Sequence, residues 1–399
     1  MTHASSLLSI VDTTRCSVQR DLLDPRAEMF ARLPRAMQPF LTWLTAKPAP
    51  GEPIRKRSPR RFVATAGLLL LAGVLISGAA LSSAGPWPWV LLPLGWLLTA
   101  SALGSCQVVI FHHCAHGTVF AGRSTNETVG RLISAVLLFK HFDLYRHDHM
   151  LHHSPKKLLT EDDEFADFVF GVCGLRAGER KSRLWCRVLA NLVSPVFHAR
   201  FLVRRVKAAL LSHDRRHNLV GIAVWGTLIV AAAATQHLAL LLAAWVLPVT
   251  VLLQIATVFR ILCEHRFPDV GTIRNRDRNF AAHATSGVFP GVVPPAQSMR
   301  SPAGLLRWLG WWAAMLFWQL PVRLFVLVGD APCHDFHHRR PASRRWTSYI
   351  QERQHDLEAD TPGFAAGYSD TWGLLRAVDA NLASLARLPA GYRPLAESA

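Results

Sequence analysis

The sequence lacks the short motifs by which many catalytic sites are recognised. It contains no GxSxG of a nucleophile elbow, no GxGxxG and no P-loop signature. Seven cysteines are present, but none forms the CxxC of a zinc ribbon or a thioredoxin-like motif. Their odd number and scattered spacing argue against a disulfide framework. The sequence therefore gives no indication of a serine hydrolase, a nucleotide-binding site or a dithiol redox site.

Acidic residues are scarce in this chain. Asp and Glu number 27 against 44 Lys and Arg, so the formal net charge is +17. Such a balance suits nucleic acid, an anionic membrane surface or an acidic partner. No nucleic-acid motif is present, and the basic residues flank apolar stretches in a chain that is 50% apolar. We therefore predict a membrane protein that does not bind nucleic acid. Residues 1–50 also lack the n-region and h-region of a secretory signal.

The apolar stretches predict an all-α, multi-pass membrane protein with about four transmembrane helices in two hairpins. The first stretch is uncharged for about 22 residues, which is enough to span the apolar core of a bilayer. Proline and glycine at 85–88 separate the first pair of helices, and a joint at 235–237 separates the second. The four expected spans are 62–83, 90–111, 219–234 and 238–261.

Other apolar segments are expected at the membrane surface. Residues 129–140 are too short to span a bilayer, and 187–211 mix apolar residues with arginines, as interfacial helices do. Residues 303–329 are rich in tryptophan but carry Arg307, Pro321 and Arg323. We favour a docked or interfacial helix there over a fifth span.

The charges orient this arrangement. The basic segments before, between and after the two hairpins lie on one side, whereas the two short turns carry no Lys or Arg. The positive-inside rule makes the basic side cytoplasmic. We expect a cytoplasmic arm at 1–60, a membrane domain at 61–345 with a cytosolic helical cap, and a tail at 346–399 that packs on the cap. The excess of arginine over lysine and the many alanines suggest the inner membrane of a bacterium with a GC-rich genome.

Three histidine clusters stand out in this chain. They read HxxxH once and HxxHH twice, the second HxxHH following the first by about 180 residues. Residues at i, i+3 and i+4 share one helix face, so each cluster presents two or three imidazoles to one point. Seven to nine imidazoles are too many for one ion and suit two, and imidazole favours iron, zinc or copper over magnesium or calcium. With His265 at the end of the fourth span, the candidate ligands are His112, His116, His149, His152, His153, His265, His334, His337 and His338.

Neighbouring residues are candidate partners of these ligands. A carboxylate that accepts the free N–H of an imidazole fixes its tautomer. Asp148, Asp335 and Asp330 lie beside the clusters for this role, and Glu264 is a candidate ligand or partner of His265. His113 and His147 point away from their clusters on a helix, so they rank below the nine. We expect the acidic run at 161–164 to be solvated and seven histidines that stand alone to be structural or surface residues: His3, His198, His213, His217, His237, His283 and His355.

With the clusters in this order after the two hairpins, residues 60–345 resemble the membrane fatty acid desaturase and hydroxylase superfamily. Arg146, three residues before the second cluster, also looks like that family. The resemblance implies four membrane helices under a cytosolic cap and a non-haem di-iron centre held almost wholly by histidine. An extra histidine near the end of the fourth span is similar to His265.

The resemblance further implies O2-dependent oxidation of an unactivated C–H bond. We expect a desaturase of a fatty acyl or lipid-like substrate, and a hydroxylase of a lipid or biosynthetic small molecule is the alternative. Two departures point to an unusual substrate, which includes a carrier-bound acyl chain. Arg339-Arg340-Pro341 replace the common apolar-Phe-Pro sequence, and His113 stands where an acidic residue is common.

No motif of a fused haem or iron–sulfur domain is present, so we expect electrons from a separate donor such as a ferredoxin. Two other classes remain open. A membrane zinc hydrolase needs fewer histidines and an open water position. A metal transporter places histidines and acids inside its spans, which the position of these clusters at span ends disfavours.

Overall fold

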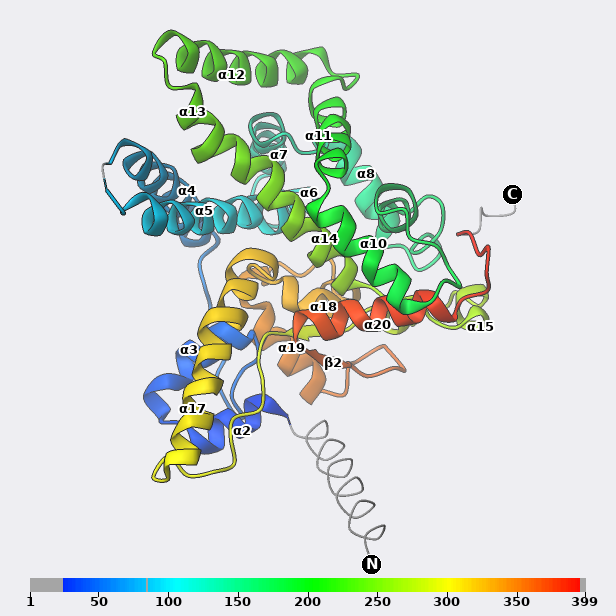
Figure 1. Cartoon of the computed structure of the whole chain (residues 1–399). Coiled ribbons are helices and arrows are strands. Elements are labelled where there is room, and N and C mark those ends of the chain that lie inside the picture. Colours follow the sequence, from blue (N-terminus) through cyan, green and yellow to red (C-terminus); the bar gives the residue numbers. More distant parts are fainter. Residues whose placement is uncertain (1–23, 84, 395–399) are drawn as a thin grey trace, which may run out of the picture.

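The computed structural model describes residues 24–83 and 85–394, and the fold is mostly helical, as predicted (Figure 1). The first 23 residues of the predicted arm, with His3, and the last five residues of the tail lie outside the described residues. Within the described residues the only sheet is a parallel pair of three-residue strands. In it, Gly287 of β1 (Gly287–Phe289) stands opposite Asp370 of β2 (Asp370–Trp372).

The first predicted hairpin is formed by α4 (Pro59–Ser82) and α5 (Pro88–Gly104), which lie side by side (Figure 1). The second helix continues through a π-helical segment, Ser105–Phe111, into α6 (His112–Ala115). The candidate span therefore runs from Pro88 to Ala115 and ends within the first histidine cluster. Small residues hold the pair together because Gly73 and Gly95 let the two backbones approach closely.

The second predicted pair of spans corresponds to α12 (Arg215–Ala234) and a helix that begins as α13 (Leu238–Leu241), while their pairing as a hairpin stays a prediction. Two π-helical segments follow, and the helix ends as α14 (Leu253–Glu264). The whole second helix, Leu238–Glu264, qualifies as one candidate span. Figure 1 shows it running from the turn after α12 into the centre of the molecule. His265 comes directly after its last residue.

A fifth segment, Pro302–Val326, is also long and apolar enough to cross a membrane. It begins as α17 (Pro302–Ala314). Its inner face places Trp308, Trp311 and Met315 against α2 (Pro25–Arg32) and α3 (Gln38–Thr45), while Phe317 on the outer face is 82% exposed. The four predicted spans thus correspond to four of five candidates in the described chain. The docked-helix interpretation of this segment stays a prediction.

The single interfacial helix predicted at 187–211 is two helices. α10 (Lys181–Val193) and α11 (Pro195–Leu210) meet at an angle of 74°. Proline lacks the N–H that a continuous helix needs and disfavours helical backbone in the residue before it. Ser194 instead adopts an extended conformation, and its side chain accepts a hydrogen bond from the N–H of Phe197, which caps the new helix.

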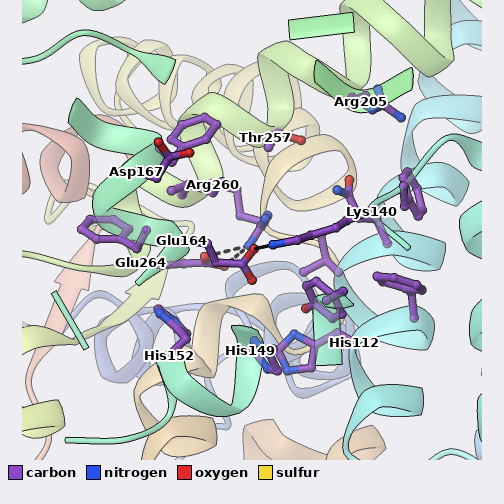
Figure 2. A pocket seen from close by; sticks show the side chains of 18 of the residues that line it. His112, Lys140, His149, His152, Glu164, Asp167, Arg205, Thr257, Arg260 and Glu264 are labelled. Carbon is purple, nitrogen blue, oxygen red and sulfur yellow. Dashed lines mark hydrogen bonds and ion pairs between the residues drawn. The ribbon is translucent and has the colours of Figure 1, made fainter. Parts of the chain in front are cut away.

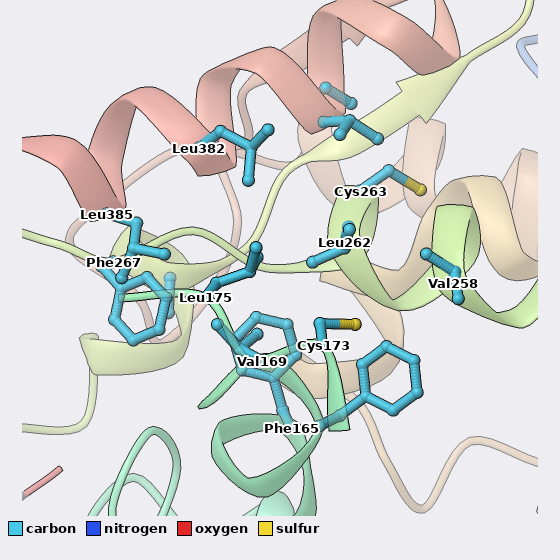
Figure 3. Close-up of a cluster of buried hydrophobic side chains, with 14 of the residues drawn as sticks. Phe165, Val169, Cys173, Leu175, Val258, Leu262, Cys263, Phe267, Leu382 and Leu385 are labelled. Carbon is cyan, nitrogen blue, oxygen red and sulfur yellow. The ribbon is translucent and has the colours of Figure 1, made fainter. Parts of the chain in front are cut away.

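A buried apolar cluster fixes the end of α14. Figure 3 shows Val258 and Leu262 of α14 facing Leu382 and Leu385 of α20 (Leu374–Arg387), with Phe165 and its neighbours on the other side. The side-chain amide of Asn381 donates to the carbonyl of Leu262 (2.9 Å), which satisfies one of the open carbonyls at the helix end. The carboxyl-terminal segment therefore helps to hold the position from which Glu264 and His265 extend.

The close approach of α4 and α5 yields a stability prediction. A Cβ atom at Gly95 would lie 2.8 Å from the Ser77 backbone nitrogen and 2.9 Å from the Gly73 carbonyl oxygen. We expect Gly95→Ala to force the helices apart and to lower the free energy of unfolding by about 1–3 kcal/mol. Thermal unfolding in detergent measures this change.

Gly67→Ala in the same hairpin is the matched control, because no described atom outside its own helix lies within 4 Å of the added methyl group. An equal melting temperature for Gly95→Ala and Gly67→Ala would show that the close approach does not limit stability.

Candidate metal centre

The nine histidines singled out in the sequence converge from four places in the fold. His112 belongs to α6, which His116 ends, and His149 and His152 belong to α8 (Phe142–His152), which His153 ends. His265 follows α14, and the third cluster lies on α18 (His334–Arg339). One ring nitrogen from each forms two compact groups, within which all such atoms lie within 4.8 Å of one another. The first group is His112, His116, His149, His153 and His337; the second is His152, His265, His334 and His338.

Each HxxHH cluster is divided between the two groups in the same way. His149 and His153 belong to the first group and His152 to the second; His334 and His338 belong to the second and His337 to the first. Along a helix, i+4 lies about 40° to one side of i and i+3 about 60° to the other, because each residue turns about 100°. The expectation that each cluster faces a single point therefore fits His112 and His116, which share the first group, whereas each HxxHH cluster is divided between two points.

The spacing of the ring nitrogens fits an ion in each group. In the first group the Nε2 atoms of His112 and His337 are 2.7 Å apart, and His149 Nε2 lies 2.9 Å from that of His116 and 3.0 Å from that of His153. In the second, His334 Nε2 lies 3.0 Å from that of His265 and 3.1 Å from that of His338. Two imidazoles about 2.1 Å from one ion and at right angles would place their nitrogens about 3.0 Å apart.

The electrostatic surroundings favour neutral rings with a free lone pair. Burial, followed by the charges of neighbouring imidazoles, lowers the pKa of His149, His153 and His338 well below the ordinary value. The same causes lower the pKa of His265 and His337. Neutral imidazole is the form that binds metal, so protons compete weakly for these nitrogens near neutral pH.

Asp163 orients one ligand candidate of the second group. Its Oδ1 lies 2.7 Å from His152 Nδ1, which turns Nε2 towards the group. Burial lowers the pKa of His152, but the charge and hydrogen bond of Asp163 outweigh it, so the pKa is raised. The expectation that residues 161–164 are solvated is wrong for Asp163, which is 0% exposed and also accepts the backbone N–H groups of Leu159 and Phe165. The acidic run was the only sequence signal for this role.

The residues ranked as partners lie outside both groups. His113 stacks on Trp346 and places its Nε2 2.9 Å from Asp330, while His147 is exposed. Asp148 is ion-paired with Lys140 and not with an imidazole. Glu264 accepts two hydrogen bonds from Arg260, at 2.7 and 2.9 Å, and is no member of either group.

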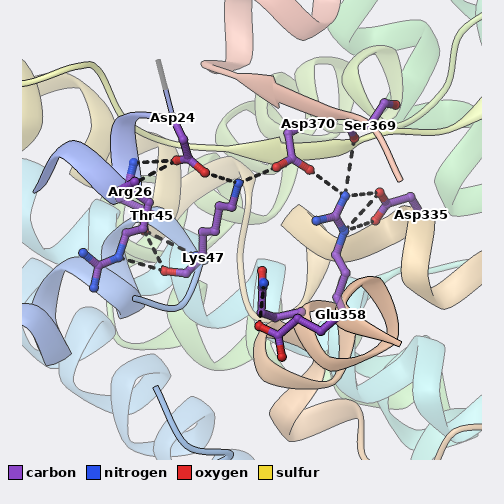
Figure 4. A network of polar contacts seen from close by, with 11 residues as sticks. Asp24, Arg26, Thr45, Lys47, Asp335, Glu358, Ser369 and Asp370 are labelled. Atoms are coloured by element: carbon purple, nitrogen blue, oxygen red, sulfur yellow. Dashed lines mark hydrogen bonds and ion pairs between the residues drawn. The ribbon is translucent and has the colours of Figure 1, made fainter. Parts of the chain in front are cut away.

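Asp335 also contacts a cation and not an imidazole. Its carboxylate binds the buried guanidinium of Arg353 on α19 (Tyr349–Glu358), with one oxygen 2.6 Å from Nη2. Arg353 reaches Asp370 (2.8 Å), and Lys47 joins Asp370 to Asp24. This chain of ion pairs connects the amino-terminal arm to the helix that carries the third cluster (Figure 4).

A cavity of about 300 Å³ lies against both groups. His112 and His149 of the first group and His152, His265 and His334 of the second line it. Its remaining wall is aromatic in part, from Tyr145, Phe165, Phe168 and Phe201, and charged in part. Figure 2 shows the charged part, where Lys140 pairs with Glu164 (3.1 Å) near Arg260 and Glu264.

The departure in the third cluster does not reach this cavity. Arg339 donates to the carbonyls of Ala366 and Gly367 and lies over the ring of Tyr368 (4.1 Å). Arg340 pairs with Asp356 (2.9 Å). Both arginines therefore anchor the segment after α19. Substrate selection is better sought in the charged wall of the cavity.

The contact between Asp163 and His152 yields a prediction about metal affinity. Replacing Asp163 with Asn removes the charge that fixes the ring of His152, and we expect metal affinity at the second group to fall about 10- to 100-fold. Metal content after equilibration with a graded chelator measures the change. Asp162→Asn, one residue away and exposed, is the control. Equal metal retention in the two variants would contradict the orienting role.

Comparison with known proteins adds independent information. The sequence model of the family described as "Fatty acid desaturase" matches residues 86–293. The sn-1 oleoyl-lipid 12-desaturase of Anabaena variabilis is 33% identical over 93 residues, which cover 23% of this chain and 26% of that protein. The chloroplastic omega-6 fatty acid desaturase of Glycine max is 35% identical over 75 residues, which cover 19% of this chain and 17% of that protein.

The aligned stretches thus span about a quarter or less of these relatives. The family match is broader, since it covers more than half of the chain and contains the first two histidine clusters and His265. On this match, the chain belongs to the fatty acid desaturase family.

Proposed function

We propose that this protein is a membrane oxidoreductase that uses two iron ions and O2 to introduce a double bond into a fatty acyl or lipid-like substrate. One observation carries the proposal: nine imidazoles, seven of them buried and two partly buried, form two groups, and members of both groups line one cavity. The relatives named as lipid and fatty acid desaturases support the reaction type.

The donor set fits two iron ions. His112, His116, His149, His153 and His337 would hold one ion, and His152, His265, His334 and His338 the other. Bound there, the iron pair would supply, together with O2 and electrons, the oxidant that removes hydrogen from an unactivated C–H bond. A catalytic zinc site needs only three protein ligands, so a zinc hydrolase leaves most of these histidines without a role.

The cavity would position the substrate. Its aromatic side chains provide an apolar part of the wall, and ligand candidates of both groups line the same cavity. A substrate carbon in this space would face both groups at once. Such fixed placement of the reacting atoms is a large part of what a protein adds to catalysis.

Hydroxylation is the second candidate because the cavity carries charge. Lys140, Glu164, Arg260 and Glu264 contribute to its lining. Burying such groups against a plain alkyl chain costs free energy, whereas a substrate with polar groups near the reacting carbon would contact them favourably. This wall favours a functionalised lipid or a biosynthetic small molecule as the alternative substrate.

Iron content, O2 uptake and product analysis test the proposal. We expect two iron ions per chain and O2 consumption under a reductant; one zinc ion and no O2 uptake would overturn the proposal. Mass spectrometry separates loss of two hydrogens, which indicates desaturation, from gain of one oxygen, which indicates hydroxylation. His152→Ala and His337→Ala, one from each group, should each lose iron and activity, whereas His147→Ala on the same helix as His152 should retain both.

The electron donor in this proposal is a separate acidic protein such as a ferredoxin, and the active side of the membrane is the cytoplasmic side of a bacterial inner membrane. The basic segment at 55–61 supports an entry site. Arg57, Arg60 and Arg61 are exposed, and none pairs with a described acidic residue. The Arg57 carbonyl accepts the hydroxyl of Thr347, two residues before Tyr349, whose hydroxyl lies 3.4 Å from His337 Nδ1.

Charge reversal tests this entry site. Arg57→Glu with Arg61→Glu should slow turnover supported by an acidic ferredoxin, and added salt should slow the wild type in the same way because it screens the attraction. Turnover with dithionite as a small reductant is the control and should not change. Ferredoxin-supported turnover that is insensitive to both changes would exclude this surface.

A further inference from the structure

A separate histidine cluster, formed by His141, His213 and His217, lies outside the metal centre, where α8, α11 and α12 meet. His141 immediately precedes α8, and its backbone N–H donates to the carbonyl of Ala208 on α11. His213 and His217 stand at the start of α12, spaced as HxxxH. Their ring centroids lie 5.1 Å and 4.6 Å from that of His141. These separations match those within the metal centre, such as 5.2 Å for His112 and His116 and 4.5 Å for His149 and His153.

The buried rings of this cluster have unused nitrogens. His141 is 0% exposed, yet neither of its ring nitrogens has a hydrogen-bond partner among the described residues. His217 is also buried; the backbone of Ala209 hydrogen-bonds its ring, while Nε2 has no described partner. Buried polar atoms without partners cost free energy, so a group that contacts them is expected. A backbone hydrogen bond on one ring nitrogen is also the usual way to orient the other towards a metal.

A carboxylate completes the cluster. Asp214 Oδ2 lies 3.7 Å from His141 Nε2. The other oxygen of Asp214 accepts the backbone N–H groups of Arg216 and His217, which caps α12 and leaves Oδ2 free for a ligand. Asp143 lies farther from His141, at 4.0 Å, and is already paired with Arg131.

The charge states suit a cation. Burial is the main cause that lowers the pKa of His141. The backbone hydrogen bond from His217 is the main cause that lowers the pKa of Asp214. A neutral imidazole and an ionised carboxylate are the forms that bind metal. The exposed side chain of His213 leaves one side of the cluster open to solvent, which provides an entry path.

We propose that His141, His213, His217 and Asp214 form a separate site for a divalent transition-metal ion such as Zn²⁺. Three imidazoles and one carboxylate are a donor set that zinc accepts in tetrahedral geometry. The ligand atoms are not gathered as closely as those in the metal centre, so binding would draw the exposed His213 and the partly buried Asp214 towards His141. The ion would then tie the start of α8, which carries His149 and His152, to the start of a membrane helix. This structural site does not depend on the proposed oxidation reaction.

Metal counting on the full-length protein in detergent tests the proposal. The protein is first loaded with iron and then equilibrated with Zn²⁺, and iron and zinc per chain are measured together. We expect wild type to gain one zinc ion without loss of iron. His213→Ala, which changes an exposed side chain, should lose this zinc ion and keep its iron. His237→Ala, also exposed and just beyond the other end of α12, is the matched control and should behave as wild type.

Thermal unfolding gives a second readout. Zn²⁺ should raise the melting temperature of wild type and His237→Ala but not of His213→Ala, because a ligand stabilises the state that binds it. Asp214→Asn keeps a capping side chain and should weaken zinc binding without loss of fold. Equal zinc content in wild type and His213→Ala, or zinc gained only as iron is lost, would overturn the proposal. Should iron loading fail, the zinc difference between the variants would still decide the question.

Discussion

The crowding of nine imidazole rings in a buried space is the constraint on which the rest of the structure depends. Ring nitrogens 2.7–3.1 Å apart can form N–H···N hydrogen bonds in pairs, and the same spacing suits nitrogens that bind one cation. A nitrogen with two such neighbours, such as His149 Nε2, can make only one of these hydrogen bonds with its single proton or lone pair. The helices around the centre serve to impose this arrangement. Three features hold the segments that carry the rings. They are the apolar packing of α14 against α20, the π-helical segment that leads into α6, and the ion pair of Asp335 on α18 with Arg353.

The identity of the nine histidines could be read from the sequence, but not how they divide. The HxxxH and HxxHH spacings identified eight of them, and all nine lie in the two groups; their role as ligands stays a prediction. The division follows from the pitch of the helix, which sends i+3 and i+4 to opposite sides of i. His265 had no spacing signal and was recognised only from its place after the fourth span. The partners of Asp163 and Arg353 lie 11 and 18 residues away in the sequence, and only the acidic run at 161–164 gave a local signal for either residue.

Arg339 and Arg340 depart from the family pattern, and both hold the chain at residues 356–368. An effect of this departure on the substrate stays a prediction. Charged side chains also lie beside the cavity. These charges come from two parts of the chain, Lys140 with Glu164 and Arg260 with Glu264, so only the fold reveals that they share one wall. The fold alone likewise brings His141 next to His213 and His217, because only the last two are close in the sequence.

The ion-pair chain through Lys47, Asp370, Arg353 and Asp335 has a practical consequence for protein engineering. The arm at 1–60 and the tail at 346–399 look dispensable when the sequence is divided by hydropathy. Deleting the arm would remove Lys47 and leave Asp370 with only Arg353, while deleting the tail would leave Asp335 as a buried charge with no counterion. A shortened version confined to 61–345 would thus lose the support beneath its third histidine cluster. Affinity tags are therefore better appended outside residues 1–399 than used to replace either segment.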